Sequence, residues 1–161
     1  MSQRGARRRA IGTAALALAC AAGGAPPPDP GPQARLDALF PEGRRTQELE
    51  ALLERAELAP GEDLRVVDLG RDAHTSHHLV AIRHAETPHR HDRHDLLVVV
   101  LRGHGALQIG DERRPLGEGS ILYVPRGAVH AFRNAGPEPA VAYVVYTPAF
   151  DGEDRILSPP P

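Results

Sequence analysis

From residue 64 to residue 147, short apolar segments alternate with turns that contain glycine or proline. The segments with β-type composition are Leu64–Leu69, His78–His84, Leu96–Leu101, Ala106–Ile109, Ile121–Val124, Val129–Arg133 and Val141–Thr147. No interval between them is long and periodic enough for a helix that connects parallel strands. The pattern therefore predicts a mainly β fold, built as a sandwich or barrel.

Residues 35–61 follow a helical pattern instead. A first short helix is predicted before Pro41, with apolar positions at i, i+3 and i+4 that fall on Leu36, Leu39 and Phe40. A second is predicted from about Thr46, which suits the N-cap, to Leu58. Its apolar face consists of Leu49, Leu52, Leu53 and Ala56. We therefore expect a helical N-terminal extension that packs on the outside of the main domain.

Residues 1–20 have the features of a bacterial export signal. Arginines between Arg4 and Arg9 precede a short apolar stretch, Ile11 to Ala19, that is too short to span a bilayer. The sequence Leu16-Ala17-Leu18-Ala19-Cys20 resembles the lipobox at which bacterial lipoproteins are cleaved and lipidated on the cysteine. The alternative is a plain secretory signal cut near Ala19 or Ala22, and the arginine run also permits a twin-arginine route.

A linker rich in proline and glycine, residues 21–34, follows this signal. Such a composition stays extended and builds no core, so it suits a tether between a membrane and a folded domain. We expect an exported protein, either lipid-anchored through Cys20 in the cell envelope or periplasmic.

Composition excludes several classes of function. The net charge is −2, four of the arginines belong to the leader, and no basic cluster follows it, so nucleic acid is not an expected partner. The chain has no lysine, which excludes Schiff-base chemistry through a side-chain amine. The single cysteine, Cys20, belongs to the leader and excludes a thiolate metal cluster and thiol catalysis in the folded domain.

Histidines carry the candidate chemistry. His89 and His91 are two residues apart, so on an extended strand their side chains face the same side and can bind one ion. His130 comes from a later predicted strand, and the three imidazoles suit Fe(II), Mn(II), Zn(II), Ni(II) or Cu(II). Eight of the nine histidines lie between His74 and His104, however, so a merely polar, titratable surface is the alternative.

Two motifs resemble those of the cupin family. Gly119-x5-Pro125-x-Gly127-x2-His130-x3-Asn134 is similar to the second cupin motif, and Thr87-Pro88-His89-Arg90-His91 with Gly103 resembles the first. The resemblance implies a cupin double-stranded β-helix, or jelly-roll barrel, over residues 62–150, with a metal inside held by His89, His91 and His130. The stretch from Thr147 to Arg155 resembles the ending of many small bacterial cupins, where it packs along the barrel, and we expect residues 151–161 to form a C-terminal tail. We expect Asp151, Glu153 and Asp154 of this tail to form a solvated turn.

The identity of a fourth ligand stays open at this point. The glutamate that the first cupin motif places before its closing glycine falls on Leu96 here. Asp95 is adjacent and is our candidate, although a shift of one along a strand turns a side chain to the opposite face. His94 is the substitute, and a three-histidine site with open water positions is the third possibility.

The predicted function is that of an exported metal-binding cupin that acts on a small organic molecule, as a metal-dependent oxygenase or isomerase. The alternatives are a non-catalytic metal- or metabolite-binding module tethered to the envelope, and a structural barrel whose role is to form a homodimer. Apolar strands should line the pocket, with the aromatic candidates Tyr123, Phe132, Tyr143 and Tyr146. His78 and His84 are candidates for groups close to the ligands.

Overall fold

The computed structural model describes residues 34–158. The predicted export signal, Cys20 and the linker up to residue 33 lie outside the described residues. Among the described residues, no helix is long and apolar enough to cross a membrane.

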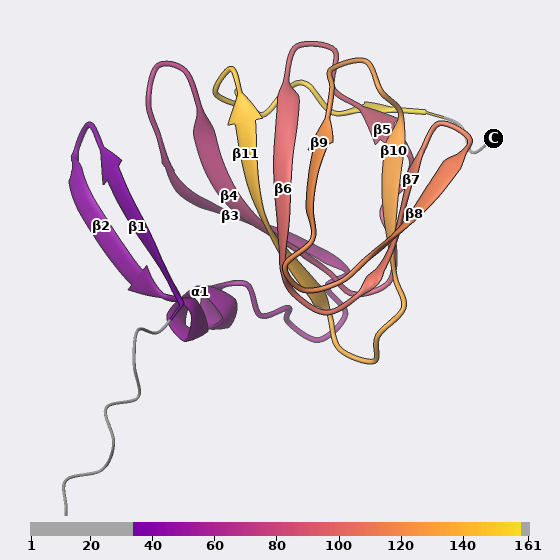
Figure 1. Cartoon of the computed structure of the whole chain (residues 1–161), viewed down its shortest axis with the longest axis horizontal. Coiled ribbons are helices and arrows are strands. Elements are labelled where there is room, and N and C mark those ends of the chain that lie inside the picture. The colour runs from indigo at the N-terminus through magenta and orange to yellow at the C-terminus, as the bar shows by residue number, and fades with distance from the viewer. Residues whose placement is uncertain (1–33, 159–161) are drawn as a thin grey trace, which may run out of the picture. The chain divides into compact units, whose positions relative to one another are not determined.

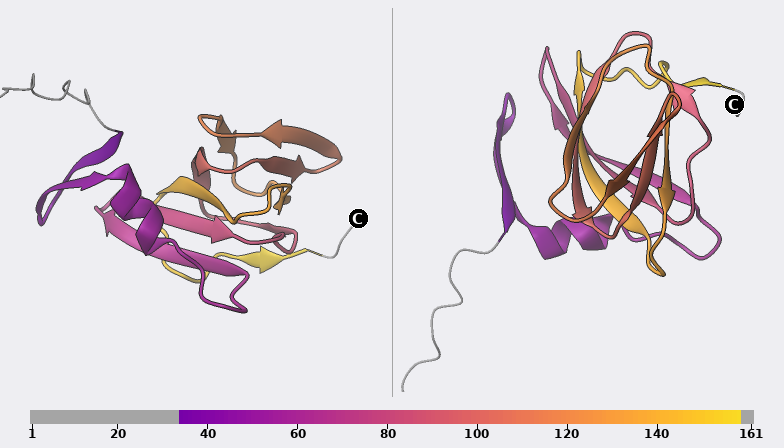
Figure 2. Two further views of the ribbon diagram at one scale, coloured as in Figure 1. Left: turned by 90° about the horizontal axis from the view of Figure 1, so that it is seen from below. Right: turned by 45° about the vertical axis from the view of Figure 1, so that its right-hand side comes forward.

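Two five-stranded sheets form the main domain (Figure 1). Their strands are β3 (Leu64–Arg71), β4 (Ser76–Ile82), β5 (His89–Arg90), β6 (Asp95–Arg102), β7 (Gly105–Ile109), β8 (Glu112–Leu116), β9 (Ile121–Val124), β10 (His130–Asn134), β11 (Ala140–Thr147) and β12 (Ile156–Leu157). One sheet has the order β3-β4-β11-β6-β9 and the other β12-β5-β10-β7-β8. The chain passes repeatedly from one sheet to the other, as in a jelly roll, and the two sheets face each other (Figure 2).

Strand periodicity explains the core between the sheets. On β6, Leu96 and Val100 are buried, while Leu97 between them is 43% exposed. Leu96 lies opposite Tyr146 of the neighbouring strand β11, and both belong to the main hydrophobic cluster. Successive residues of a strand face opposite sides of the sheet, so every second side chain points into the core. There it packs against the side chain opposite it on the neighbouring strand.

The second predicted helix is present and packs as expected. Helix α1 (Leu49–Arg55) is shorter than predicted and begins after Glu48, not Thr46. Its buried side chain Leu52, with Ala56 just after the helix, contacts Leu79 and Val141 on the outer face of the sheet. Helix and sheet together remove a second apolar cluster from water, which stabilises the extension on the domain.

The first predicted helix was wrong. Strands β1 (Arg35–Phe40) and β2 (Gly43–Glu48) form an antiparallel hairpin instead. Leu36 and Phe40 fit a two-residue period as well as a helical one, and six residues are too few to separate the two patterns. In the hairpin, the ring of Phe40 is buried, with its centroid 5.1 Å from that of His77 on β4, so this strand packs against the main domain.

Short or polar strands escaped the prediction. β8 has the sequence Glu-Arg-Arg-Pro-Leu, is largely exposed and lies at the edge of its sheet, where Pro115 is tolerated. β5 and β12 have only two residues each and pair with one another. No hydrophobic period can reveal strands of that length.

Candidate metal centre

The structure brings His89, His91 and His130 together. His89 begins β5 and lies directly opposite His130, the first residue of β10, and His91 follows β5. One ring nitrogen from each residue falls within 4.8 Å of the others, and all three residues are buried. These three histidines are called the triad below.

Each imidazole of the triad is oriented by a backbone carbonyl. Nδ1 of His89 donates to the carbonyl of Thr87, 2.9 Å away, and Nδ1 of His130 to that of Ala128, also 2.9 Å away. Nδ1 of His91 donates to the carbonyl of Asp154. A carbonyl can only accept, so each Nδ1 carries the proton and each Nε2 keeps its lone pair.

The residues present fit a divalent metal ion. The Nε2 atom of His91 is buried and has no hydrogen-bond partner among the described residues. A buried nitrogen without a partner is costly unless a ligand satisfies it. Imidazoles whose second nitrogen is bound to a carbonyl are the usual form of histidine ligands to metals. The triad is thus compatible with a transition metal.

Burial keeps the triad neutral. It lowers the pKa of His89 to about 3, with the neighbouring His130 adding to the shift. Burial also lowers the pKa of His91 to about 4, although the carbonyl of Asp154 partly opposes it, and the pKa of His130 falls in the same direction. Neutral imidazoles are the form that binds a metal, so the site needs no deprotonation at neutral pH.

These pKa values predict how the metal-free protein responds to acid. Unfolded histidines take up protons as the pH falls below about 6.5, whereas folded His89 and His91 do not until about pH 3 and pH 4. The free energy of unfolding should therefore fall by about 4 kcal/mol between pH 6.5 and pH 4.5, or about 2 kcal/mol for each of the two histidines. Urea unfolding of chelator-treated protein at several pH values between 6.5 and 4.5 measures this change in the free energy of unfolding. A double variant, His89→Gln with His91→Gln, should flatten the slope, and an unchanged slope would contradict the assignment.

The structure does not bring Asp95 to the triad. The carboxylate of Asp95 accepts hydrogen bonds from the Arg126 guanidinium at 2.7 Å and from the Arg126 amide at 2.8 Å. These bonds lower the pKa of Asp95 to about 2. The buried neighbour Leu96 lines the cavity instead, so the one-residue shift turns the carboxylate away, as strand parity requires.

His94 is also engaged elsewhere, with Asp154 from the tail. Its Nδ1 donates to the Asp154 carboxylate at 2.6 Å. The same carboxylate accepts the amides of Asp92, at 3.0 Å, and Arg93, at 2.8 Å. Asp154 is only 2% exposed, so the expectation of a solvated turn was wrong for this residue. Residues 149–158, called the C-terminal strap below, therefore hold the segment that carries His91.

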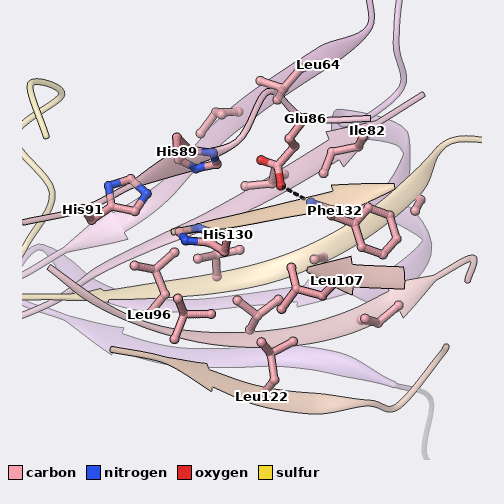
Figure 3. Close-up of a pocket in the computed structure, with 18 of the residues that line it drawn as sticks. Leu64, Ile82, Glu86, His89, His91, Leu96, Leu107, Leu122, His130 and Phe132 are labelled. Atoms are coloured by element: carbon pink, nitrogen blue, oxygen red, sulfur yellow. Dashed lines mark hydrogen bonds between the residues drawn. The ribbon is translucent and has the colours of Figure 1, made fainter. Parts of the chain in front are cut away.

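A cavity of about 150 Å³ adjoins the triad. Most of its wall is aliphatic, and it includes the predicted aromatic residues Phe132 and Tyr146 but not Tyr123 or Tyr143. Figure 3 shows the three imidazoles at one end of this cavity. His78 is buried, where its ring bonds to the hydroxyl of Ser76 and contacts the ring of Tyr146 edge-on. His84 is exposed, and neither histidine lines the cavity.

Glu86 is, with Arg155, one of two charged or polar side chains of the cavity that the sequence did not predict. Its carboxylate points into the same space as the triad (Figure 3), where one oxygen accepts the Phe132 amide at 3.1 Å. Burial raises the pKa of Glu86 above its ordinary value. It lies three residues before His89, outside both motifs, and only the pairing of its backbone with Phe132 places it here.

Comparison with known proteins decides the family. Residues 76–146 match the cupin domain. Over 113 residues the chain is 34% identical to an uncharacterized protein of Aquifex aeolicus (strain VF5), a match that covers 70% of this chain and 92% of that protein. The chain belongs to the cupin family.

Solved structures agree with this assignment. The cupin resembles the protein TT1209 from Thermus thermophilus with a TM-score of 0.54 and 26% identity, over 61% of this chain and 95% of that one. It also resembles a protein with a double-stranded β-helix domain from Klebsiella pneumoniae, with a TM-score of 0.58 and 19% identity, over 68% of this chain and 95% of that one. The predicted double-stranded β-helix fold is confirmed.

Proposed function

We propose that this cupin is a metal-dependent enzyme that acts on a small organic molecule inside the barrel. The observation that carries the proposal is the triad itself, whose three Nδ1 atoms are fixed by carbonyls at one end of an apolar cavity. Iron, manganese, zinc, nickel and copper ions all accept such nitrogen ligands. Three protein ligands leave coordination positions for a substrate, which is the arrangement of catalytic sites.

Side chains of the cavity would surround a bound ion with an apolar wall and one carboxyl group. A bound divalent ion would supply Lewis-acid or redox chemistry next to His89, His91 and His130. The aliphatic wall excludes water, which strengthens electrostatic interactions inside the cavity. Glu86 is the group that exchanges a proton with the substrate, through the carboxylate oxygen that is not bound to the Phe132 amide. Burial raises the pKa of Glu86, which is the direction that a carboxyl group needs to act as a general acid as well as a base.

Metal content is the first test. Full-length protein purified without chelating resin and supplemented in turn with Fe(II), Mn(II), Zn(II), Ni(II) and Cu(II) should retain one ion per chain of at least one metal. Elemental analysis after gel filtration measures it. Content well below one equivalent for every metal would contradict the proposal.

Turnover separates an enzyme from a binding module. Metal-loaded protein is incubated with pools of small organic molecules, and the pools are followed by NMR together with oxygen consumption. Glu86→Gln should lower any observed turnover by about 10²- to 10⁴-fold, the usual contribution of acid–base catalysis, without lowering the metal content. Glu138→Gln is the matched control, since Glu138 is exposed and does not line the cavity. Stoichiometric metal without turnover would favour the non-catalytic module.

A further inference from the structure

The C-terminal strap carries one cation to the cavity. Arg155 lines the cavity although it is exposed and far from both motifs in the sequence. Its place is fixed from both sides, because Asp154 before it is buried and Ile156 after it pairs with Arg90 of β5. The strap thus presents Arg155 beside the triad as part of a built structure.

The guanidinium of Arg155 keeps most of its hydrogen-bonding capacity. One of its nitrogens lies 3.4 Å from Nδ1 of His89, which carries a proton and cannot accept a hydrogen bond, and 3.5 Å from the carbonyl of Thr87, which is longer than an ordinary hydrogen bond. Among residues 34–158, no carboxylate forms an ion pair with it. Its remaining N–H groups are available to a ligand, and a guanidinium matches the two oxygens of a carboxylate.

Charge at this end of the cavity favours an anion. The triad is neutral by itself, so a bound divalent ion would leave its full positive charge next to the Arg155 guanidinium. Glu86 also lies in this cavity, where burial raises the pKa of its carboxyl, while the Phe132 amide and the Arg155 guanidinium act in the opposite direction. Beyond these groups the wall is apolar, and a cavity of about 150 Å³ in a protein core is known to accommodate a molecule as large as benzene.

We propose that the cavity binds a small monocarboxylic acid, with its carboxylate held by Arg155 beside the triad and its apolar part in the aliphatic interior. This inference rests on the proposed function, because it assigns the substrate class of the same metal-dependent site. It makes Arg155 the residue that determines specificity.

Matched acids and amides test the proposal. Full-length protein loaded with Zn(II) is titrated in a calorimeter with acetate and acetamide, butyrate and butyramide, and benzoate and benzamide. At least one acid should bind about tenfold or more tightly than its amide. Arg155→Gln should weaken binding of that acid by about 10- to 100-fold, the range for hydrogen bonds to charged groups, and leave the amide unchanged. Arg155→Lys keeps the charge and should recover part of the affinity.

Controls distinguish this inference from the proposed function. Arg113→Gln removes an exposed arginine that does not line the cavity, and it should leave all affinities unchanged. Zinc content is measured for every variant, so a failure of metal binding overturns the proposed function. Retained zinc with no acid bound, with equal affinity for acid and amide, or with an unaffected Arg155→Gln variant overturns the inference alone. Tighter binding of phenyl phosphate than of benzoate would overturn the choice of a carboxylate.

Discussion

Replacement of His130 with alanine should weaken metal binding more than about 100-fold. Loss of a group that only orients a ligand typically costs about 10- to 100-fold in metal affinity, and loss of a ligand should cost more. His130 is the member of the triad that comes from the second motif, and its ring centroid lies 4.4 Å from that of His89. Without it, two imidazoles from one short segment remain. Competition with a coloured chelator measures the affinity.

His74→Ala is the matched control for this variant. His74 is exposed in the turn before β4 and is not part of the triad, so its removal should leave metal affinity within about twofold, or about 0.4 kcal/mol. Circular dichroism of the metal-free variants shows whether each has folded. A folded His130→Ala protein that binds metal as tightly as His74→Ala would refute the assignment of the triad.

Apolar segments and short motifs in the sequence predicted most of the long strands and the histidines of the triad. The strands that are nearly continuous apolar runs between turn residues, such as β6 and β11, were found to within a few residues. His89, His91 and His130 were placed together at the sequence level because two motifs resemble those of the cupin family. The residues of each motif lie close together in the sequence, whereas the resemblance supplied the meeting of the two motifs.

Residues placed by long-range contacts escaped the prediction. Asp154 meets His94 across 60 positions of sequence, and the Glu86 carboxylate meets the Phe132 amide across 46. No local period marks either residue, and the acidic composition around Asp154 is typical of a surface turn. For Asp95, strand parity already argued from the sequence alone that the side chain faces away from the ligands, and in the structure its carboxylate pairs with Arg126.

Asp154→Ala should both destabilise the fold and weaken metal binding. The buried carboxylate accepts the amides of Asp92 and Arg93 and Nδ1 of His94, and its removal leaves these three donors without that partner. Hydrogen bonds to a charged group contribute about 1.5–3 kcal/mol each, and the Nδ1 donor of His94 is buried, so the free energy of unfolding should fall by about 3 kcal/mol or more. The segment that carries His91 then loses its anchor, and metal affinity should fall about 10- to 100-fold.

Asp151→Ala provides the comparison within the same strap. The Asp151 carboxylate pairs with Arg93 at 2.8 Å, but both side chains are largely exposed, and exposed ion pairs contribute about 0–1 kcal/mol. Thermal unfolding and chelator competition on both variants measure the difference. If the two variants have the same thermal stability and the same metal affinity, the strap only covers the barrel. If Asp154→Ala alone loses stability and metal affinity together, the strap is part of the metal centre, because Asp154 connects it to the residues around His91.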